Sequence, residues 1–146
     1  MTKDIQFKPF EMRDLCMFEP IDDQDFWELM EWNIRLKDRN FVSVIGVSGV
    51  VLAIVGMTYI RRGVAEVGVF RSKSYDKKKG LYARFMKFLL DEYLPENFDI
   101  VRLELYIDID WPKADRWASF LGFEYEGICK CYDIEKKDHK QYARIY

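Results

Sequence analysis

The residues most able to bind a metal lie near the carboxyl end of the chain. Cys129 and Cys131 form a C-x-C pair, and His139 is the single histidine. A zinc site takes four ligands at recognised spacings, so this group is too small and we expect no metal. We expect these cysteines and the third, Cys16, to be reduced thiols of a cytoplasmic protein. Because His139 lies in a run of charged residues, a turn position is favoured over a catalytic role.

A second group of residues could bind an anion. Lys77, Lys78 and Lys79 directly precede Gly80, where a segment with helical spacing begins. The free N–H groups and the dipole of a helix N-terminus favour an anion. A glycine at this place lets a phosphate approach the backbone closely. A solvated basic loop in front of a helix explains the same four residues.

The elements that would position these groups follow from the spacing of apolar residues. Residues 26–36 and 80–93 have helical spacing, with Pro95 expected to end the second helix. Pro112 predicts a short helix that ends at Gly122. A polar loop is expected at 74–79. Strands are expected at residues 5–10, 41–47, 50–59, 64–70, 100–109, 123–132 and 141–145.

An uncharged run of 20 residues, 41–60, is long enough to span a bilayer. It is rich in Val and Ile, which favour strands, and Ser48-Gly49 near its middle is a turn signal. We therefore predict a hairpin buried on both faces and no membrane span. The charged first ten residues do not have the apolar core of a signal peptide.

Size and charge restrict the class of protein. The length of 146 residues predicts one domain, residues 1–146. The hydrophobic content of 49% is too high for a disordered chain. A net charge of −2 weighs against a nucleic-acid binder, although Arg61, Arg62 and the lysines at 77–79 could form a local phosphate-binding patch.

Three segments resemble a known family. They are Glu-Val-Gly-Val-Phe at 66–70, Lys-Lys-Lys-Gly at 77–80, and Trp-Ala-Ser-Phe-Leu-Gly-Phe-Glu-Tyr-Glu-Gly at 117–127. They are similar to the strand before the cofactor loop, that loop, and the closing segment of the GNAT superfamily of N-acetyltransferases. The last segment looks most like the GNAT-like proteins of tailed bacteriophages. The resemblance covers residues 40–146 and implies a mixed α+β fold: a central, mostly antiparallel twisted sheet of six or seven strands, flanked by helices.

The resemblance also implies a reaction, the transfer of an acetyl group from acetyl-CoA to a primary amine of a small molecule or protein. The family pattern places the cofactor on Val69, Phe70, Lys77, Lys78, Lys79, Gly80, Leu81 and Tyr82. Glu66 matches a common family position for the base that takes the proton of the amine. The alternative for Glu66 is a partly buried carboxylate paired with Arg61, Arg62 or Arg102.

This chain departs from the family pattern in the loop and at the acid. The loop pattern Gln/Arg-x-x-Gly-x-Gly/Ala has Lys77 at its first place and Tyr82 at its last, so the loop is degenerate. Where many members have an Asn and a Tyr acid, this chain has Trp111 and Ala118. An alanine methyl cannot protonate a thiolate.

Other phenols could replace that acid if the fold brings one close to the cofactor. Tyr125 is our candidate, with Tyr106 and Tyr132 as the other choices; otherwise solvent protonates the thiolate. Asp108 and Asp110 at a strand end either line an acceptor groove or cap the strand, and capping is favoured.

Two functions therefore compete. The first is an active N-acetyltransferase, favoured by Gly80 and Glu66. The second is a catalytically inactive, GNAT-derived phage protein that acts as a virion component or binds a host protein, favoured by the missing acid. Trp27, Trp32 and Tyr146 are candidates for a protein-partner surface.

Overall fold

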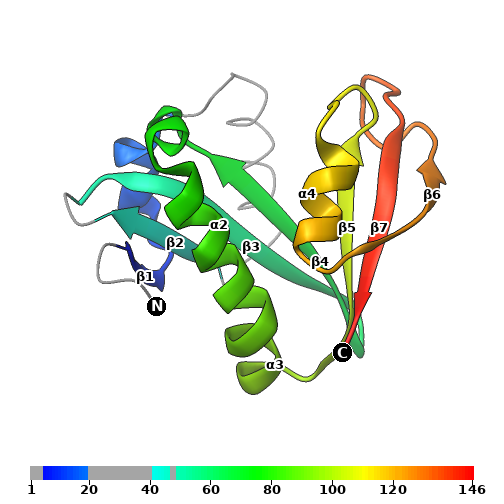
Figure 1. Cartoon of the computed structure of the whole chain (residues 1–146), viewed down its shortest axis with the longest axis horizontal. Coiled ribbons are helices and arrows are strands. Elements are labelled where there is room, and N and C mark those ends of the chain that lie inside the picture. Colours follow the sequence, from blue (N-terminus) through cyan, green and yellow to red (C-terminus); the bar gives the residue numbers. More distant parts are fainter. Residues whose placement is uncertain (1–4, 20–40, 47–48) are drawn as a thin grey trace. The chain divides into compact units, whose positions relative to one another are not determined.

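The computed structural model describes residues 5–19, 41–46 and 49–146 (Figure 1). Over these residues the strands follow the hydrogen-bonded order β1-β2-β3-β4-β5-β7-β6. The pairs β1–β2, β2–β3, β5–β7 and β6–β7 are antiparallel, whereas β4–β5 is parallel. The predicted mixed α+β fold with a mostly antiparallel sheet is confirmed. The predicted helix at 26–36, with Trp27 and Trp32, lies outside the described residues.

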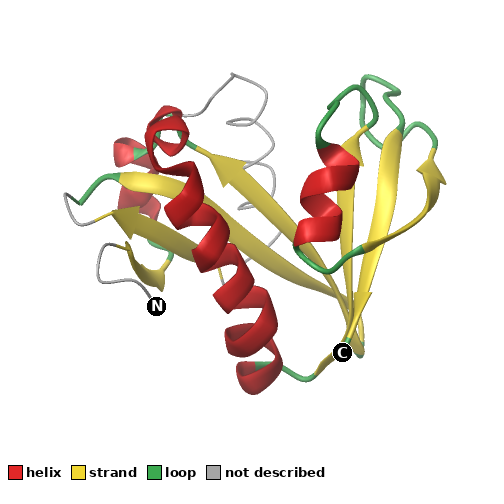
Figure 2. Cartoon of the chain, viewed as in Figure 1, coloured by secondary structure: helices red, strands yellow, loops and turns green. Residues whose placement is uncertain are grey.

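Helices and strands alternate along the chain much as the sequence predicts (Figure 2). The strands are β1 (Ile5–Pro9), β2 (Phe41–Gly46), β3 (Val51–Arg61), β4 (Gly63–Arg71), β5 (Ile100–Asp108), β6 (Glu124–Cys129) and β7 (His139–Ile145). The helices are α2 (Lys79–Phe88), α3 (Leu94–Asn97) and α4 (Ala114–Phe120), with 3-10 turns at Met12–Met17 and Lys73–Lys78 and a π-turn at Leu89–Tyr93.

The chain forms two compact units. The first comprises Met1–Thr58 and Gly68–Leu89, and the second comprises Tyr59–Val67 and Leu90–Tyr146. Strands β3 and β4 each contribute residues to both units. The single domain over residues 1–146 stays a prediction.

The first unit contains the hairpin that the uncharged run predicts. Strands β2 and β3 pair from Phe41 with Gly56 to Ile45 with Val51. Every residue from Val51 to Thr58 is buried, so both faces of β3 are covered. In the part of the chain that the structure describes, no helix is both long and apolar enough to cross a membrane.

Helix α2 begins one residue earlier and ends sooner than predicted. The chain continues through the π-turn into α3. Pro95 lies in the first turn of α3, where a backbone N–H has no hydrogen-bond partner within the helix, so the N–H that proline lacks is not missed. The prediction of a loop at 74–79 is wrong, because a 3-10 turn at Lys73–Lys78 runs directly into α2. Phe85 of α2 packs against Phe7 of β1, with ring centroids 5.4 Å apart.

The second unit is organised by β5 and α4. The alternation on β5 is confirmed at Leu103, Leu105 and Ile107, which are buried, but Val101 at the strand start is 56% exposed. Helix α4 ends at Phe120, and Gly122 follows two residues later with a φ of +80°, which favours glycine because it carries no Cβ. The parallel pairing of β4 with β5 places Glu66, the predicted catalytic carboxylate, next to β5.

Candidate active site

Glu66 lies half-buried on β4 and accepts a hydrogen bond from another part of the second unit. The hydroxyl of Tyr132, in the turn after β6, donates to Glu66 Oε1 at 2.7 Å. Parallel pairing sets Glu66 directly beside Glu104 of β5, and paired residues of neighbouring strands point to the same face. Two carboxylates therefore lie side by side on this face.

Glu104 is buried. Its partners Arg102 and Tyr106 lie two positions before and after it on β5, so all three side chains point to the same face. Arg102 Nε donates to Glu104 Oε1 at 2.9 Å, and the hydroxyl of Tyr106 donates to Oε2 at 2.9 Å. Arg102 also makes a bidentate contact with Glu126. Burial, followed by the hydrogen bond to Glu104, raises the pKa of Tyr106 above its ordinary value. Tyr106 is therefore a neutral donor at physiological pH.

Aromatic rings cover the same face. The Tyr132 ring stacks on Tyr106 with centroids 4.8 Å apart and contacts the His139 ring at 4.3 Å. His139 is the first residue of β7 and is buried, which corrects its assignment to a charged turn. Its Nδ1 is buried without a hydrogen-bond partner among the described residues. We call Glu66, Glu104, Tyr106, Tyr132 and His139 the Glu66 cluster.

The alternative interpretation paired Glu66 with Arg61, Arg62 or Arg102. The contacts recorded for these arginines are different. Arg102 bonds Glu104 and Glu126 instead, while Arg61 and Arg62 are exposed at the end of β3 and in the following turn. Tyr132 was one of the other choices for the acid, but its contact with Glu66 was not predicted, because the two residues lie 66 positions apart and leave no local signal. The predicted hairpin of the last two strands is the one feature that could have suggested it.

Tyr125, the candidate acid, lies on the opposite face of the sheet. It pairs with Tyr142 of β7, which pairs with Leu105 of β5. Because side chains alternate along a strand, Leu105 points away from the face that carries Glu104. The structure therefore does not bring Tyr125 to Glu66, whereas it does bring Tyr132 there.

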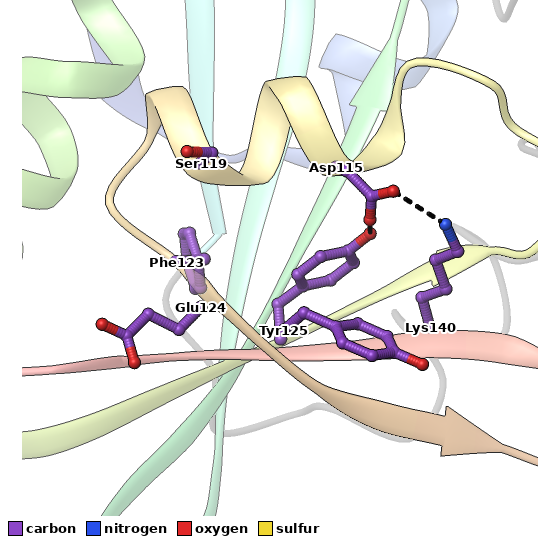
Figure 3. Close-up of a pocket in the computed structure, with 7 residues that line it drawn as sticks. Asp115, Ser119, Phe123, Glu124, Tyr125 and Lys140 are labelled. Atoms are coloured by element: carbon purple, nitrogen blue, oxygen red, sulfur yellow. Dashed lines mark hydrogen bonds and ion pairs between the residues drawn. The ribbon is translucent and has the colours of Figure 1, made fainter.

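Tyr125 instead lines a shallow hollow of about 630 Å³ beneath α4 (Figure 3). In this hollow Asp115 accepts hydrogen bonds from the Tyr142 hydroxyl at 2.5 Å and from Lys140 at 3.0 Å. These two bonds, the one from Tyr142 first, lower the pKa of Asp115. Asp115 is exposed and forms an ion pair with Lys140. The hollow is lined by Asp115, Ser119, Phe123, Glu124, Tyr125, Lys140 and Tyr142.

The aspartates at the end of β5 differ in their contacts. Asp108 accepts a hydrogen bond from the backbone N–H of Asp110 at 2.9 Å and from Lys137 Nζ at 2.7 Å. Burial acts to raise the pKa of Asp108, but the hydrogen bonds from Lys137 and the Asp110 backbone outweigh it and the pKa is lowered. Asp108 therefore caps the end of β5, whereas the Asp110 carboxylate forms an ion pair with Lys137 at 3.7 Å.

The residues expected to hold the cofactor lie in the first unit, at the end of β4 and the start of α2. Lys77, Lys78, Lys79 and Gly80 are all exposed. The side chain of Lys78, the N-cap residue of α2, makes no capping hydrogen bond. A Cβ built on Gly80 would meet no atom within 4 Å, so there is open space beside its backbone. This combination of cations, free space and a helix start fits a pyrophosphate.

Tyr82 does not occupy that open space. Its side chain is 1% exposed and packs edge-on against Tyr75, with centroids 4.6 Å apart. Burial, with a smaller contribution from Tyr75 and against the effect of Arg71, raises the pKa of the Tyr82 phenol far above its ordinary value. The bulky ring at the family's small-residue position is thus a core residue of the first unit. Leu81 beside it is half-buried.

Val69 and Phe70 continue β4 beyond its pairing with β5. The ladder between the two strands runs from Gly63 to Glu66 on β4. Val69 is half-buried, whereas Phe70 is buried with Phe18, Val51 and Ile54. Only the backbone of Phe70 is therefore available to a ligand, because its ring belongs to the core.

The positions of the family acid are filled by structural residues. Ala118 on α4 is fully buried, and its carbonyl accepts a hydrogen bond from the Phe123 N–H at 2.9 Å. Trp111 is half-buried in the turn after β5, and its backbone N–H donates to the Asp108 carbonyl.

Tyr146, a candidate for a partner surface, donates a hydrogen bond from its hydroxyl to the Leu90 carbonyl at 2.8 Å.

Known structures share this fold. No protein-family model matches the chain, and no curated protein sequence matches it. The chain is similar to the spermidine/spermine N-acetyltransferase SpeG from Vibrio cholerae, with 17% identity over 97% of this chain and 92% of that one and a TM-score of 0.68. It is likewise similar to the ribosomal-protein-S5-alanine acetyltransferase from Vibrio fischeri, with 18% identity over 99% and 94% of the two chains and a TM-score of 0.70. The chain has the acetyltransferase fold that the sequence resemblance predicted.

Proposed function

We propose that the chain is an N-acetyltransferase that moves an acetyl group from acetyl-CoA to a primary amine. The observation that carries this proposal is the start of α2, where Lys77, Lys78 and Lys79 are exposed beside the open backbone of Gly80. The shared fold supports it, because both neighbours named above are described as N-acetyltransferases or acetyltransferases.

The start of α2 would hold the pyrophosphate of the cofactor. Three lysines offer positive charge, and a helix N-terminus offers backbone N–H donors to the same anion. Lys77 retains a cation at the first place of the family pattern. The last place is Tyr82, whose burial removes its ring from the exposed surface. Val69 and Phe70 would contribute backbone groups, because β4 has ended its ladder with β5 there.

Glu66 would act as the base. Acetyl-CoA supplies the acetyl group as a thioester. The ammonium of the acceptor gives a proton to the Glu66 carboxylate, directly or through water, and the neutral nitrogen then attacks the thioester carbon. A C–N bond forms as the C–S bond breaks, and the thiolate leaves with the electron pair. The nitrogen of the new C–N bond releases its extra proton to solvent, which leaves a neutral amide. Because Ala118 cannot donate a proton, the thiolate takes one from solvent.

Calorimetric titration with acetyl-CoA tests the proposal. The triple variant Lys77→Ala, Lys78→Ala, Lys79→Ala should weaken binding roughly tenfold or more, because three exposed charge contacts are lost. The control is Lys87→Ala, since Lys87 is an exposed lysine in the last turn of α2. Equal binding by the triple variant and the control would place the cofactor elsewhere. No heat from the wild-type chain at millimolar acetyl-CoA would reject the enzyme.

The second candidate is a catalytically inactive, GNAT-derived protein of a tailed phage, present in the cytoplasm of its bacterial host or in the virion, where it binds another protein. The burial of Ala118 at the acid position favours it, because no phenol can reach that place without repacking. Mass spectrometry would detect acetylation of an added amine. Binding of acetyl-CoA without such acetylation would support this candidate over the enzyme.

A further inference from the structure

The hollow beneath α4 lies apart from the candidate base. It is built within the second unit alone, from α4, the segment that leads into β6, β6 itself and β7 (Figure 3). Its volume of about 630 Å³ is in the range of ordinary small-molecule pockets. Tyr125 and Tyr142, which line it, point away from the face of the sheet that carries Glu66. The proposed acetyl transfer therefore gives this hollow no role.

Part of the lining is an accessible aromatic surface. Phe123 and Tyr142 are buried, whereas Tyr125 is 54% exposed. The rings of Tyr125 and Tyr142 pack edge-to-face, with centroids 5.8 Å apart and an angle of 65° between their planes. Such a contact with a buried ring fixes the orientation of the exposed one. Tyr125 therefore offers a positioned surface on which an apolar face of a ligand can be buried.

Beside these rings the hollow presents hydrogen-bond acceptors and donors next to each other. Asp115 of α4 accepts hydrogen bonds from Lys140 Nζ at 3.0 Å and from the Tyr142 hydroxyl at 2.5 Å. Among the described residues neither Asp115 nor Lys140 has a further partner. A carboxylate has acceptor positions for more than two hydrogen bonds, and an ammonium has more than one N–H to donate. Both groups can therefore bond a ligand without giving up their contact with each other.

The charges around the hollow favour a neutral ligand. Asp115 and Lys140 offset each other as an ion pair, and Glu124, which also lines the hollow, leaves one negative charge. An anion would be repelled by both carboxylates, and a cation would be repelled by the Lys140 ammonium. A hydroxyl group avoids both penalties, because it can donate to Asp115 and accept from Lys140 at the same time. Neighbouring hydroxyls on one ring match this arrangement.

We propose that the hollow beneath α4 binds a pyranose sugar ring. The apolar C–H face of the sugar lies on the Tyr125 ring, and two neighbouring hydroxyls of the sugar bond Asp115 and Lys140. This inference goes beyond the proposed function. None of the residues that line the hollow takes part in the proposed acetyl transfer, so the sugar site stands or falls by itself.

Amide NMR of the full chain tests the site directly. Methyl α-D-glucopyranoside, methyl α-D-mannopyranoside and methyl α-D-galactopyranoside differ in the arrangement of neighbouring hydroxyls. At least one of them should shift the signals of Tyr125, Ser119 and Lys140 saturably, with a Kd of about 1 mM, because the contacts are few and the hollow is open.

Two further probes each keep half of the proposed recognition. Glycerol has neighbouring hydroxyls but no ring, and cyclohexanol has a ring but no neighbouring hydroxyls. Both should bind at least about tenfold more weakly than the best glycoside, since each gives up either the aromatic contact or the hydrogen bonds.

Variants of the full chain assign the two parts of the site. Tyr125→Ala removes the aromatic surface and should weaken the best glycoside at least about tenfold, whereas Tyr125→Phe keeps that surface and should bind as the wild type does. The matched control is Tyr59→Ala, because Tyr59 is an exposed tyrosine of the same unit at the end of β3, outside the hollow. Asp115→Asn removes the charged acceptor and should weaken binding about three- to tenfold. Dispersed amide spectra verify that each variant is folded.

Several outcomes would overturn the sugar site. If none of the three glycosides shifts these signals, the hollow does not bind a sugar. Cyclohexanol that binds as tightly as the best glycoside would make the hollow an apolar pocket, and methylguanidinium that binds more tightly would make it a cation site. Unchanged glycoside binding by Tyr125→Ala would place the sugar elsewhere. Titration with acetyl-CoA is a separate measurement, so a failure there rejects the proposed function and leaves the sugar site intact.

Discussion

The hydroxyl of Tyr132 donates a hydrogen bond to Glu66 Oε1 at 2.7 Å, although the two residues are 66 positions apart in the chain. The contact joins the turn after β6 to the candidate base on β4. It also brings the rings of Tyr106 and His139 to the same face. A carboxylate that looks isolated in the sequence is therefore part of a cluster of phenols, a second carboxylate and an imidazole.

Replacing Glu66 should separate chemistry from cofactor binding. Glu66→Gln removes the proton acceptor but keeps the shape, so acetyl transfer should fall about 10²-fold or more, whereas acetyl-CoA binding should stay the same. The control is Glu124→Gln, because Glu124 is an exposed carboxylate beside the hollow under α4. Steady-state rates and calorimetry measure the two effects. A Glu66→Gln variant with the wild-type rate would rule Glu66 out as base.

Gly80 should show opposite effects on stability and on binding. Gly80→Ala meets no neighbouring atom, so a better helix former there should stabilise the fold by up to about 1 kcal/mol. The added methyl should nevertheless weaken acetyl-CoA binding, because it fills the space that a phosphate would use. Thermal unfolding and calorimetry measure both.

The contrasting variant is Gly122→Ala. Gly122 has φ +80°, and its Cβ would lie 3.2 Å from an Arg144 nitrogen, so we expect a loss of about 1 kcal/mol or more in the free energy of unfolding. Cofactor binding by Gly122→Ala should remain normal. If Gly80→Ala binds acetyl-CoA as well as the wild type does, the phosphate does not lie against this backbone.

Tyr82 should behave as a core residue. Tyr82→Ala removes a ring that is 1% exposed and packed on Tyr75, so it should destabilise the chain by about 3–5 kcal/mol. Tyr125→Ala, at a site that is 54% exposed, should cost far less. Urea unfolding compares the two. Stronger acetyl-CoA binding by Tyr82→Gly would show instead that this ring obstructs the cofactor.

Restoring the family acid should fail for steric reasons. Ala118 is fully buried on α4, so Ala118→Tyr should overpack the core and cost about 3 kcal/mol or more. Ser119→Tyr, one residue further along the helix at an exposed position, should be tolerated. Thermal unfolding of both variants tests this, and a stable, more active Ala118→Tyr would show that α4 can accept the phenol.

Acid should weaken the contact between Arg102 and Glu126. Hydrogen bonds from Arg102 lower the pKa of Glu126 in the folded chain, so the unfolded chain binds its proton first as the pH falls. The stabilisation is present above the ordinary glutamate pKa and is lost as the pH falls through the lowered folded-state value. Solvent screening at this exposed pair limits the effect to about 0.5 kcal/mol.

Glu126→Gln removes the titrating carboxylate, so its unfolding free energy should change less between pH 7 and pH 3 than that of the wild type. Urea unfolding at several pH values measures the difference, with Glu124→Gln as the control. Identical curves for all three proteins would mean that Arg102 and Glu126 do not contribute to stability in solution.

Local patterns in the sequence were enough to predict most of the fold. Alternation on β5, the hairpin of β2 with β3 and the glycine that follows α4 each depend on neighbours within a few residues, and the structure confirms all three. Ser48 of the predicted turn lies outside the described residues. The segment at 74–79 was wrongly predicted as a loop, because its polar composition does not distinguish an exposed 3-10 turn from an irregular loop.

The composition of the candidate cofactor segment at 77–80 and the position of Glu66 on a strand were determined by the sequence alone, because both are properties of adjacent residues. Tertiary structure decided the surroundings of each. Register between β4 and β5 placed Glu104 beside Glu66, the pairing of β6 with β7 placed Tyr132 over it and Tyr125 on the other face, and packing on Tyr75 buried Tyr82. Such contacts depend on strand pairing and burial between distant segments, for which the local sequence carries no signal.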